Sequence, residues 1–297
     1  MSNTSNELLS TVWRVVKLPL YYMLYQFIFS VIAMIALLIY VGASGAVSVE
    51  IIASGNPEEI VSAIMAAIPE SAFVWVMSLG LVLAAATMLW HLIYWGYFSF
   101  GKSPFREVSG KVMLLSIMLV FASMSAFNIM AQELGLPDEL AEVMKQMSNN
   151  FLGCFGIAVL GPILEEVLFR GAIQGYLMRK YNPVVGIVVA SVIFGVIHKN
   201  PIQIFYATCL GLVFGWMYYR IRSLMPVIIG HVLNNSLATI SMIMSTEGEE
   251  SATPTTERVA IMGGSMLAVV ALMYLINRLQ PALSSPWRGI GDKEYKE

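Results

Sequence analysis

Charged residues are scarce in this chain of 297 residues. Aspartate, glutamate, lysine and arginine together make up 12% of it, with a formal net charge of -2 at pH 7. Soluble domains carry about 25% charged residues, so a soluble globular protein is excluded. The basic residues are also scattered, and without a basic cluster the sequence indicates no nucleic-acid partner.

Cysteine and histidine are scarcer still. The two cysteines, Cys154 and Cys209, both lie in apolar stretches, and we interpret them as small packing residues rather than as a disulfide or a metal pair. The zinc-binding motif HExxH is absent. The chain has three histidines, His91, His198 and His231, so chemistry that needs an imidazole is confined to these positions.

Hydrophobic residues, by contrast, make up 58% of the chain. A helix needs about 20 mostly apolar residues to cross a bilayer. The first apolar run is longer than the roughly 7–15 residues of a signal peptide core, so we expect it to stay as a span. We therefore predict an all-α fold, a polytopic membrane helix bundle of about eight transmembrane helices in the lipid bilayer. The expected spans, of which the fifth is short, are 18–42, 72–100, 112–131, 149–178, 183–198, 202–221, 224–245 and 259–278.

Lysine and arginine gather in alternate loops of this predicted bundle. The remaining loops hold only Lys145, Lys199 and Arg258. The positive-inside rule then puts both termini in the cytoplasm, as an even number of spans requires. We predict an integral, multi-pass membrane protein, in the plasma membrane if the chain is prokaryotic. The basic residues on the predicted inner side are Arg14, Lys17, Lys102, Arg106, Lys111, Arg179, Lys180, Arg220, Arg222, Arg278, Arg288, Lys293 and Lys296.

The spans divide the chain into four parts. Residues 1–148 form an N-terminal membrane region of three spans with two acidic outer loops, about 44–71 and 132–148, which we expect as short surface helices or as solvated connectors. Residues 149–245 carry four spans, and 246–279 an outer loop and the last span. Residues 280–297 are a polar tail that we expect to be cytoplasmic and disordered.

The stretch GPILEEVLFRG, residues 161–171, carries three charged residues inside an apolar span. One charged side chain at the centre of a membrane helix costs about 2.5–3.5 kcal/mol on insertion scales, so these three must face a polar interior and satisfy one another. Glu166 and Arg170 are four residues apart on one helical face, and we expect them to pair. Glu165 lies about 100° around the helix without an obvious local partner, which suits a general base.

Two of the histidines have aromatic or amide neighbours at helical spacing. In FGVIH, Phe194 and His198 are four residues apart, and in HVLNN, His231 and Asn235 are four apart. One carboxylate, two imidazoles and an amide on three spans suit a site that activates water. Two histidines and a carboxylate are also a ligand set for catalytic zinc, so the sequence leaves open whether Zn2+ takes part.

These three stretches resemble the motifs EExxxR, FxxxH and HxxxN of the CPBP family, which comprises CAAX prenyl proteases and bacteriocin-processing enzymes, also described as Abi or self-immunity proteins. The motifs occur in order within 165–235, each on a separate span, and the resemblance covers about 149–245. It implies that 149–245 is a catalytic core and that the chain is an intramembrane endopeptidase. The implied substrate is a peptide or membrane protein, prenylated in a CAAX-type role.

The resemblance also implies roles for the motif residues. Glu165 would activate the attacking water. His198 and His231 would orient the water, bind a metal or stabilise the oxyanion, and Asn235, or its neighbour Asn234, would donate to that oxyanion. A zinc ion would be held by Glu165, His198 and His231. The catalytic residues implied in this way are Glu165, Glu166, Arg170, His198, His231 and Asn235.

The predicted spans leave one geometric conflict. His198 falls near the outer end of its span, whereas His231 falls nearer the inner end of its own. Either the fifth span stops within the membrane at HKNP, where Pro201 favours an early stop, or the predicted boundaries are wrong by several residues.

Other interpretations use the same residues differently. A transporter or proton relay also employs buried glutamate, arginine and histidine, but we find no repeated halves. A non-catalytic self-immunity or regulatory scaffold would tolerate replacement of Glu165. His91 has no acidic or amide partner nearby, and we interpret it as a residue for packing or hydrogen bonding, and Phe194 as part of the cavity wall.

Two further protease signatures carry little weight. GASG, residues 42–45, matches the GxSG motif of rhomboid proteases, but Ser44 has no assignable histidine partner. GIGD, residues 289–292, matches the GxGD motif of presenilin-like proteases, but it lies in the polar tail.

Overall fold

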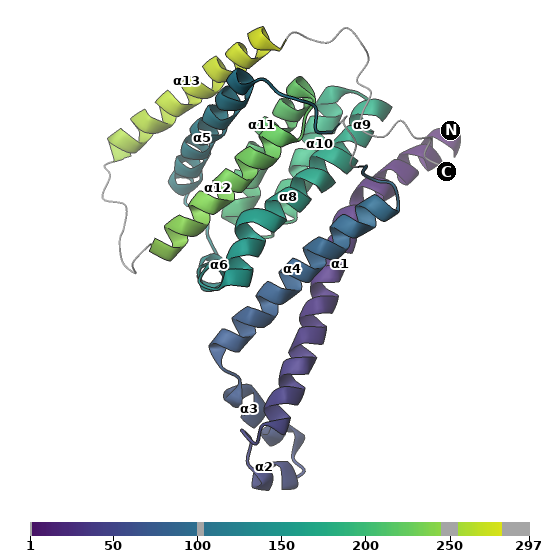
Figure 1. Ribbon diagram of the computed structural model, residues 1–297, viewed down its shortest axis with the longest axis vertical. Coiled ribbons are helices and arrows are strands. Elements are labelled where there is room, and N and C mark those ends of the chain that lie inside the picture. Colours follow the sequence, from purple (N-terminus) through teal and green to yellow (C-terminus); the bar gives the residue numbers. More distant parts are fainter. Residues whose placement is uncertain (1, 100–103, 245–254, 281–297) are drawn as a thin grey trace.

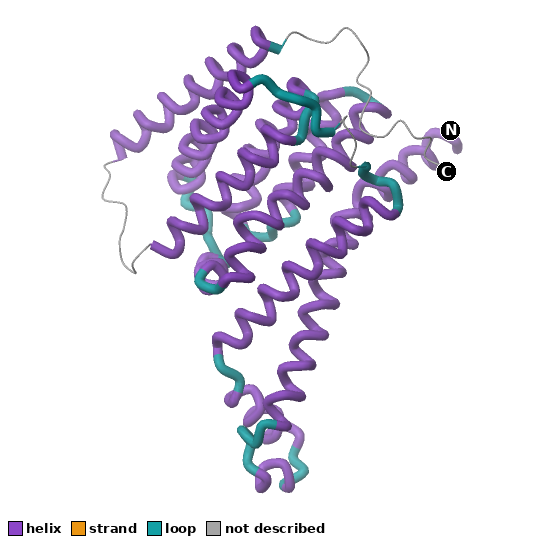
Figure 2. The backbone as a smooth tube through the Cα atoms, viewed as in Figure 1, coloured by secondary structure: helices purple, strands orange, loops and turns teal. Residues whose placement is uncertain are grey.

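The computed structural model describes residues 2–99, 104–244 and 255–280, and every regular element in these ranges is a helix (Figures 1 and 2). The predicted all-α membrane bundle is therefore confirmed. Seven of the described helices are long and apolar enough to cross a membrane: Ser5–Ala43, Ser71–Tyr94, Gly110–Glu133, Phe151–Lys180, Pro201–Ile221, Met225–Met244 and Thr255–Leu279.

The spans pack as two groups that share one core (Figure 1). Helices α1 (Ser2–Ala43) and α4 (Glu70–Tyr94) run side by side and diverge from the other helices toward Ala43 and Glu70. Helix α13 (Thr255–Leu279) packs on α5 (Gly110–Glu133), which also contacts α11 (Pro201–Ile221) and α12 (Met225–Met244). The span from Phe151 to Lys180 lies between the two groups.

The predicted fifth span is a short helix that ends early. Helix α10 (Pro183–Val196) has 14 residues, which gives a length of about 21 Å, short of the roughly 30 Å of a bilayer core. The chain then reverses at Lys199, whose φ is 61°, and α11 begins at Pro201. The helix thus ends before HKNP, which agrees with the first of the two explanations for the conflict in depth between His198 and His231.

An outer loop fastens this reversal. The side-chain amide of Asn200, which is 1% exposed, donates to Asp138 at 2.7 Å and accepts from the backbone N–H of Glu139 at 3.2 Å. The N–H of Ile202 donates to the carbonyl oxygen of Pro137 at 3.3 Å. The turn that carries His198 is therefore held from the segment between α5 and α6 (Ala141–Ser148).

Both outer loops contain the short helices that were one of the two expectations. The loop 44–71 holds α2 (Val49–Ala53) and α3 (Pro57–Ala67), and the loop 132–148 holds α6. The side chain of Asn56 caps α3 by accepting from the N–H of Glu58, and Pro57 occupies its first turn, where no N–H is needed.

The fourth span, Phe151 to Lys180, departs twice from regular α-helix. It consists of α7 (Phe151–Phe155), the π-helix η1 (Gly156–Leu160), α8 (Gly161–Glu165), the π-helix η2 (Glu166–Gln174) and α9 (Gly175–Lys180). In η1 the N–H of Gly161 donates five residues back to Gly156, just before Pro162, which has no N–H to donate. Such π-helical insertions occur frequently at functional sites, and η2 begins at the second motif glutamate.

Several sequence-based expectations concern residues outside the described ranges, namely the tail 281–297 with its GIGD match and the loop 245–254. Cys154 and Cys209 are free and half-buried, so they form no disulfide with each other. The division of the chain into four parts stays a prediction, although the core joins buried residues from nearly all spans: Tyr22, Met88, Leu119, Phe169, Phe214 and Leu272.

Candidate active site

The first motif lies at the junction of α8 and η2, in the middle of the fourth span. Arg170 Nη1 donates to Glu166 Oε1 at 3.0 Å, and the two side chains are 1% and 0% exposed. The pair expected from the spacing of four residues is therefore formed, fully buried. Arg170 Nη2 also donates to the carbonyl oxygen of Gly211 in α11 at 3.2 Å.

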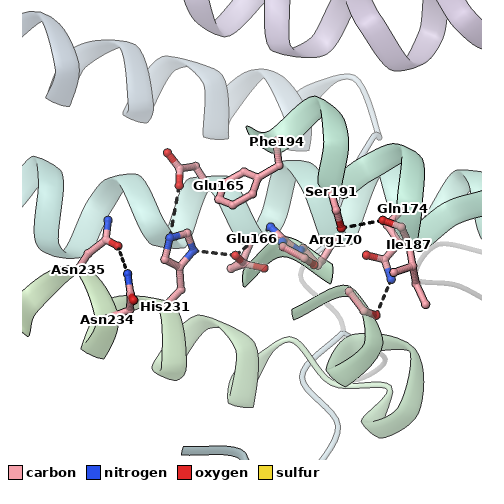
Figure 3. A network of polar contacts seen from close by, with 12 residues as sticks. Glu165, Glu166, Arg170, Gln174, Ile187, Ser191, Phe194, His231, Asn234 and Asn235 are labelled. Atoms are coloured by element: carbon pink, nitrogen blue, oxygen red, sulfur yellow. Dashed lines mark hydrogen bonds and ion pairs between the residues drawn. The ribbon is translucent and has the colours of Figure 1, made fainter. Parts of the chain in front are cut away.

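His231 of α12 lies between the two glutamates (Figure 3). Its Nδ1 is 2.7 Å from Glu166 Oε1, and its Nε2 is 3.6 Å from Glu165 Oε2. Glu166 is neutralised by Arg170 and can only accept, so Nδ1 carries the hydrogen of this bond. In the neutral imidazole Nε2 is then a hydrogen-bond acceptor directed toward Glu165.

Two phenylalanine rings hold the cation and the imidazole of this cluster. The Arg170 guanidinium lies 4.6 Å from the ring centre of Phe194 and 5.5 Å from that of Phe214. The His231 ring lies 5.8 Å from Phe194, perpendicular to it, and 5.2 Å from Phe214. Cation–π contacts of this kind are strongest where water is absent, so α10 and α11 both help to hold the charged pair.

His198 stands apart from the four clustered residues. It lies in the turn after α10, half-buried, with Nδ1 2.7 Å from the carbonyl oxygen of Phe194. Its ring packs perpendicular to the Phe194 ring at 5.0 Å. The Phe194 ring thus contacts both imidazoles. Because a carbonyl only accepts, Nδ1 of His198 carries the hydrogen, and its Nε2 is an acceptor in the neutral form.

The two asparagines after His231 form a chain of hydrogen bonds. Asn235 Nδ2 donates to the carbonyl oxygen of Ile157 in η1 at 3.0 Å. Its Oδ1 accepts from Asn234 at 2.8 Å, and the Tyr206 hydroxyl donates to Asn234 Oδ1 at 2.5 Å. The amide expected to serve an oxyanion therefore also fastens α12 to the first π-helix, and one of its two N–H groups remains for a substrate.

The predicted zinc ligands fit a metal only in part. The 3.6 Å between Glu165 Oε2 and His231 Nε2 is close to the ~3.4 Å expected of two ligands on one tetrahedral zinc. The Nδ1 bond to Glu166 is the kind of support that metal-binding histidines receive. Within the described ranges, however, no three histidine, cysteine, aspartate or glutamate side chains gather closely enough to hold a metal ion. The arrangement therefore brings together two of the three predicted ligands, without His198.

Sequence reasoning missed several residues around the site. Tyr22 of α1 is 4% exposed and lies close enough to Glu165 for an electrostatic interaction. Its helix is far away in the sequence, and no spacing rule could have found it. Gln174, by contrast, continues the helical face of Glu166 and Arg170 by one more step of four residues, which is a readable signal.

His91 takes the packing and hydrogen-bonding role expected of it. Its Nδ1 lies 2.8 Å from the Tyr25 hydroxyl, and its ring packs against Tyr21 and Tyr97. The Ser44 hydroxyl donates to the carbonyl oxygen of Val41 at the end of α1.

The segment that carries the cluster is similar to known proteins. Residues 147–237 match the family described as Type II CAAX prenyl endopeptidase Rce1-like. YdiL of Bacillus subtilis (strain 168), which carries the name of a membrane peptidase, is 33% identical over 86 residues, or 29% of this chain and 35% of YdiL. The membrane-embedded CAAX protease MroQ of Staphylococcus aureus (strain USA300) is 31% identical over 107 residues, or 33% of this chain and 42% of MroQ.

The family match covers the motif residues and leaves out most of the other spans. The chain spans less than half the length of either relative, and no solved structure gives a significant match. The matched range excludes α1, α4, α5 and α13. Residues 147–237 match the Rce1-like CAAX endopeptidase family, and this match confirms for this part of the chain the resemblance to the CPBP family that its three motifs predict.

Proposed function

We propose that this chain is an intramembrane endopeptidase that hydrolyses a peptide bond with water activated by Glu165 and His231. The observation that carries the proposal is the position of His231 between two carboxylates, 2.7 Å from Glu166 and 3.6 Å from Glu165. Ionisable residues inside a membrane bundle are costly and mark functional sites. The family of residues 147–237 supports the same class of reaction.

In the proposed reaction Glu165 is the general base. It takes a proton from water while the water oxygen bonds to the carbonyl carbon of the substrate, whose carbonyl oxygen becomes an oxyanion. Glu165 then returns the proton to the amide nitrogen, the C–N bond breaks, and an acid and an amine leave. A positioned base of this kind contributes about 100- to 10,000-fold.

Glu166 serves the reaction by orienting His231. It accepts a hydrogen bond from Arg170, and it holds the Nδ1 hydrogen of the imidazole. The Nε2 lone pair therefore faces Glu165, and the two acceptors offer a place for both hydrogens of one water. This arrangement resembles the logic of catalytic triads, in which a buried carboxylate fixes the tautomer of a histidine.

The remaining motif residues lie around this pair. Nε2 of neutral His198 is an acceptor, so His198 fits the orientation of water better than the stabilisation of an oxyanion. The free N–H of Asn235 is a donor, and a donor aimed at developing negative charge is worth most where water is excluded. The reaction can be written with these groups and water alone.

The alternative mechanism is hydrolysis assisted by a zinc ion. Glu165 and His231 would hold it, with His198 as the predicted third ligand, and bound zinc lowers the pKa of its water. Because the described side chains provide two ligands where catalytic zinc sites use three, we derive no step through it.

The test is cleavage of a peptide library by the purified protein in detergent, with each peptide offered with and without a prenyl group. We expect cleavage by the wild type, none by Glu165→Gln, and wild-type cleavage by the matched control Glu59→Gln, an exposed glutamate on α3. Comparing each peptide with and without its prenyl group shows whether the substrate must be prenylated. A wild type that cleaves nothing, or a Glu165→Gln variant that cleaves as well as the wild type, contradicts the proposal and favours a transporter or a scaffold.

A further inference from the structure

Three polar side chains follow one another on one buried face of η2. Glu166, Arg170 and Gln174 are spaced four residues apart and are 0%, 1% and 0% exposed (Figure 3). The first two belong to the motif EExxxR, and Gln174 lies outside all three motifs. A fully buried glutamine in a membrane span needs a reason, because its amide must find partners within the protein.

Two backbone carbonyls of α11 receive these side chains. Arg170 Nη2 donates to Gly211 at 3.2 Å, and Gln174 Nε2 donates to Gly215 at 2.8 Å. The two donors are four residues apart along η2, and the two acceptors are four residues apart along α11. Two successive hydrogen bonds therefore link these helices. A shift of α11 along η2 would therefore break both bonds at once.

A side chain at either acceptor position would press on the side chains that pack against it. A Cβ atom at Gly215 would lie 2.9 Å from Gln174 Oε1. A Cβ atom at Gly211 would lie 3.3 Å from Arg170 Nη2 and 3.2 Å from a ring carbon of Phe194. Small residues that let a polar side chain reach a helix backbone are typical of close contacts between membrane helices.

The bonding of Gln174 indicates that its N–H group matters more than its volume. Its Oε1 atom is buried without a hydrogen-bond partner, while Nε2 donates to Gly215 and lies 3.7 Å from Met178 Sδ. A methionine would fill the same space without a buried unpaired oxygen. The glutamine therefore serves the bond to α11.

This bond bears on the candidate active site through Arg170. The guanidinium holds Glu166 with Nη1 and Gly211 with Nη2, while its Nε has no hydrogen-bond partner. Its orientation thus depends on where α11 lies relative to η2. Glu166 Oε1 in turn receives His231 Nδ1 at 2.7 Å.

We propose that Gln174 is a positioning residue of the active site. With Gly211 and Gly215 it fixes α11 against η2, and so fixes Arg170, Glu166 and the imidazole of His231. Its significance for catalysis rests on the proposed endopeptidase function, but its effect on His231 can be measured without a substrate.

The experiment is nuclear magnetic resonance of the full chain in detergent, labelled with 15N in its three histidine rings. The Nδ1 hydrogen of His231, in a short bond to a carboxylate, gives a far-downfield signal, which a His231→Gln variant assigns. We expect this signal to move or broaden in Gln174→Met, while the signals of His91 stay. In the matched control Gly263→Ala, where a Cβ meets nothing within 4 Å, all signals should stay.

A second pair of variants separates positioning from packing. Gly215→Ala should lower the unfolding temperature because its Cβ presses on Gln174. The double variant Gln174→Ala with Gly215→Ala should regain much of that stability, since the Gln174 side chain no longer meets the new Cβ. Its His231 signal should still be displaced from the wild-type position. If Gln174→Met does not fold, this double variant gives the answer. A His231 signal at its wild-type position in either folded variant overturns the proposal.

Kinetics complete the test once a cleaved peptide is known. Gln174→Met should lower kcat about 10- to 100-fold, the size of effect expected from a small misplacement of catalytic groups. Its KM should stay unchanged, because Gln174 is fully buried and out of reach of a substrate. A lowered unfolding temperature with kcat unchanged would reduce Gln174 to a structural residue. If no peptide is cleaved, the proposed function fails, but the spectra still decide the role of Gln174.

Discussion

His231 contacts two adjacent glutamates whose surroundings differ. Glu166 is 0% exposed and bonded to Arg170, whereas Glu165 is 15% exposed and has only the imidazole of His231 within ion-pairing distance among the described contacts. An anion that is buried and neutralised can fix the orientation of a neighbour, and an anion that no cation is bonded to can accept a proton. Neighbouring residues of one type thus receive different roles from their surroundings.

This difference predicts opposite stability effects for two matching substitutions. Glu166→Gln should lower the unfolding temperature in detergent, because Arg170 loses its charged partner in a buried site. Glu165→Gln should leave it nearly unchanged, since the carboxylate is partly exposed and Arg170 keeps its bond to Glu166. Thermal unfolding of both variants checks this, and equal losses of stability would contradict the assignment of roles.

The pair itself can be tested by removing both partners. Arg170→Ala should destabilise the protein by roughly 3–5 kcal/mol, because Glu166 is left as an uncompensated buried charge. Adding Glu166→Gln should recover part of this loss. Unfolding measurements on the two single variants and the double variant form a cycle, and additive losses would show that the two residues do not interact.

Zinc binding also depends on individual residues. If zinc is bound, purified active protein should contain about one zinc per chain, and His231→Ala should remove it, because structural or catalytic zinc needs its full ligand set. His198→Ala should remove it as well only if that side chain joins Glu165 and His231. Elemental analysis of the three proteins measures this. Full activity at far less than one metal per chain, unaffected by a chelator, would leave the glutamate and histidine groups as the whole mechanism.

The sequence predicted the contacts of some motif residues and misplaced others for a physical reason. The Glu166–Arg170 pair follows from helical spacing, which holds for a pair within one continuous helix. His198 was expected beside Glu165, but its helix ends at Val196, so spacing no longer fixes the direction of its side chain. The Phe194 ring occupies the position between the two imidazoles.

At the scale of elements, α10 ends early, and His198 in the turn that follows contacts the same Phe194 ring as His231. Helix α10 packs along α11, and the reversal between them is fixed by the bonds of Asn200 to Asp138 and Glu139. Pro201 gave a signal for the break, whereas the anchoring loop joins positions more than 60 residues apart. For the π-helices, Pro162 beside η1 is a comparable signal in the sequence, and η2 has none.

Close packing of α10 on α11 gives a prediction for this pair of helices. A Cβ at Gly195 would lie 1.9 Å from Thr208 Oγ1 and 2.7 Å from the backbone oxygen of Ile204. Gly195→Ala should therefore lower stability by about 1–3 kcal/mol, the usual effect of overpacking. Thr208→Ala should rescue it only in part, because the backbone oxygen remains. Unfolding in detergent measures the loss, with Gly263→Ala as control, and a Gly195→Ala variant as stable as the control would contradict the packing.

At the scale of the whole molecule, some residues around the candidate active site lie outside the matched range 147–237. Tyr22 of α1 reaches the surroundings of Glu165, and buried residues of α4 and α5 belong to the same core as Phe169 and Phe214. Hydropathy predicted the number and type of the long spans because both depend on composition alone. It could not predict which spans surround the motifs, since packing partners depend on contacts far apart in the sequence.

The course of the chain predicts that both ends lie on one side of the membrane. Seven long helices would put the ends on opposite sides, but α10 also reverses the direction of the chain between α9 and α11, which restores an even number of passes. The excess of basic residues near the ends then favours the cytoplasm. Single cysteines introduced as Asn6→Cys, Glu58→Cys and Gln280→Cys, in a Cys154→Ala, Cys209→Ala background, can be labelled with a membrane-impermeant maleimide. Only Glu58→Cys, on α3, should react in intact cells, and all three should react after lysis. Reaction of one terminal cysteine but not the other in intact cells would mean that α10 does not return the chain, and reaction of both would mean that the orientation is inverted.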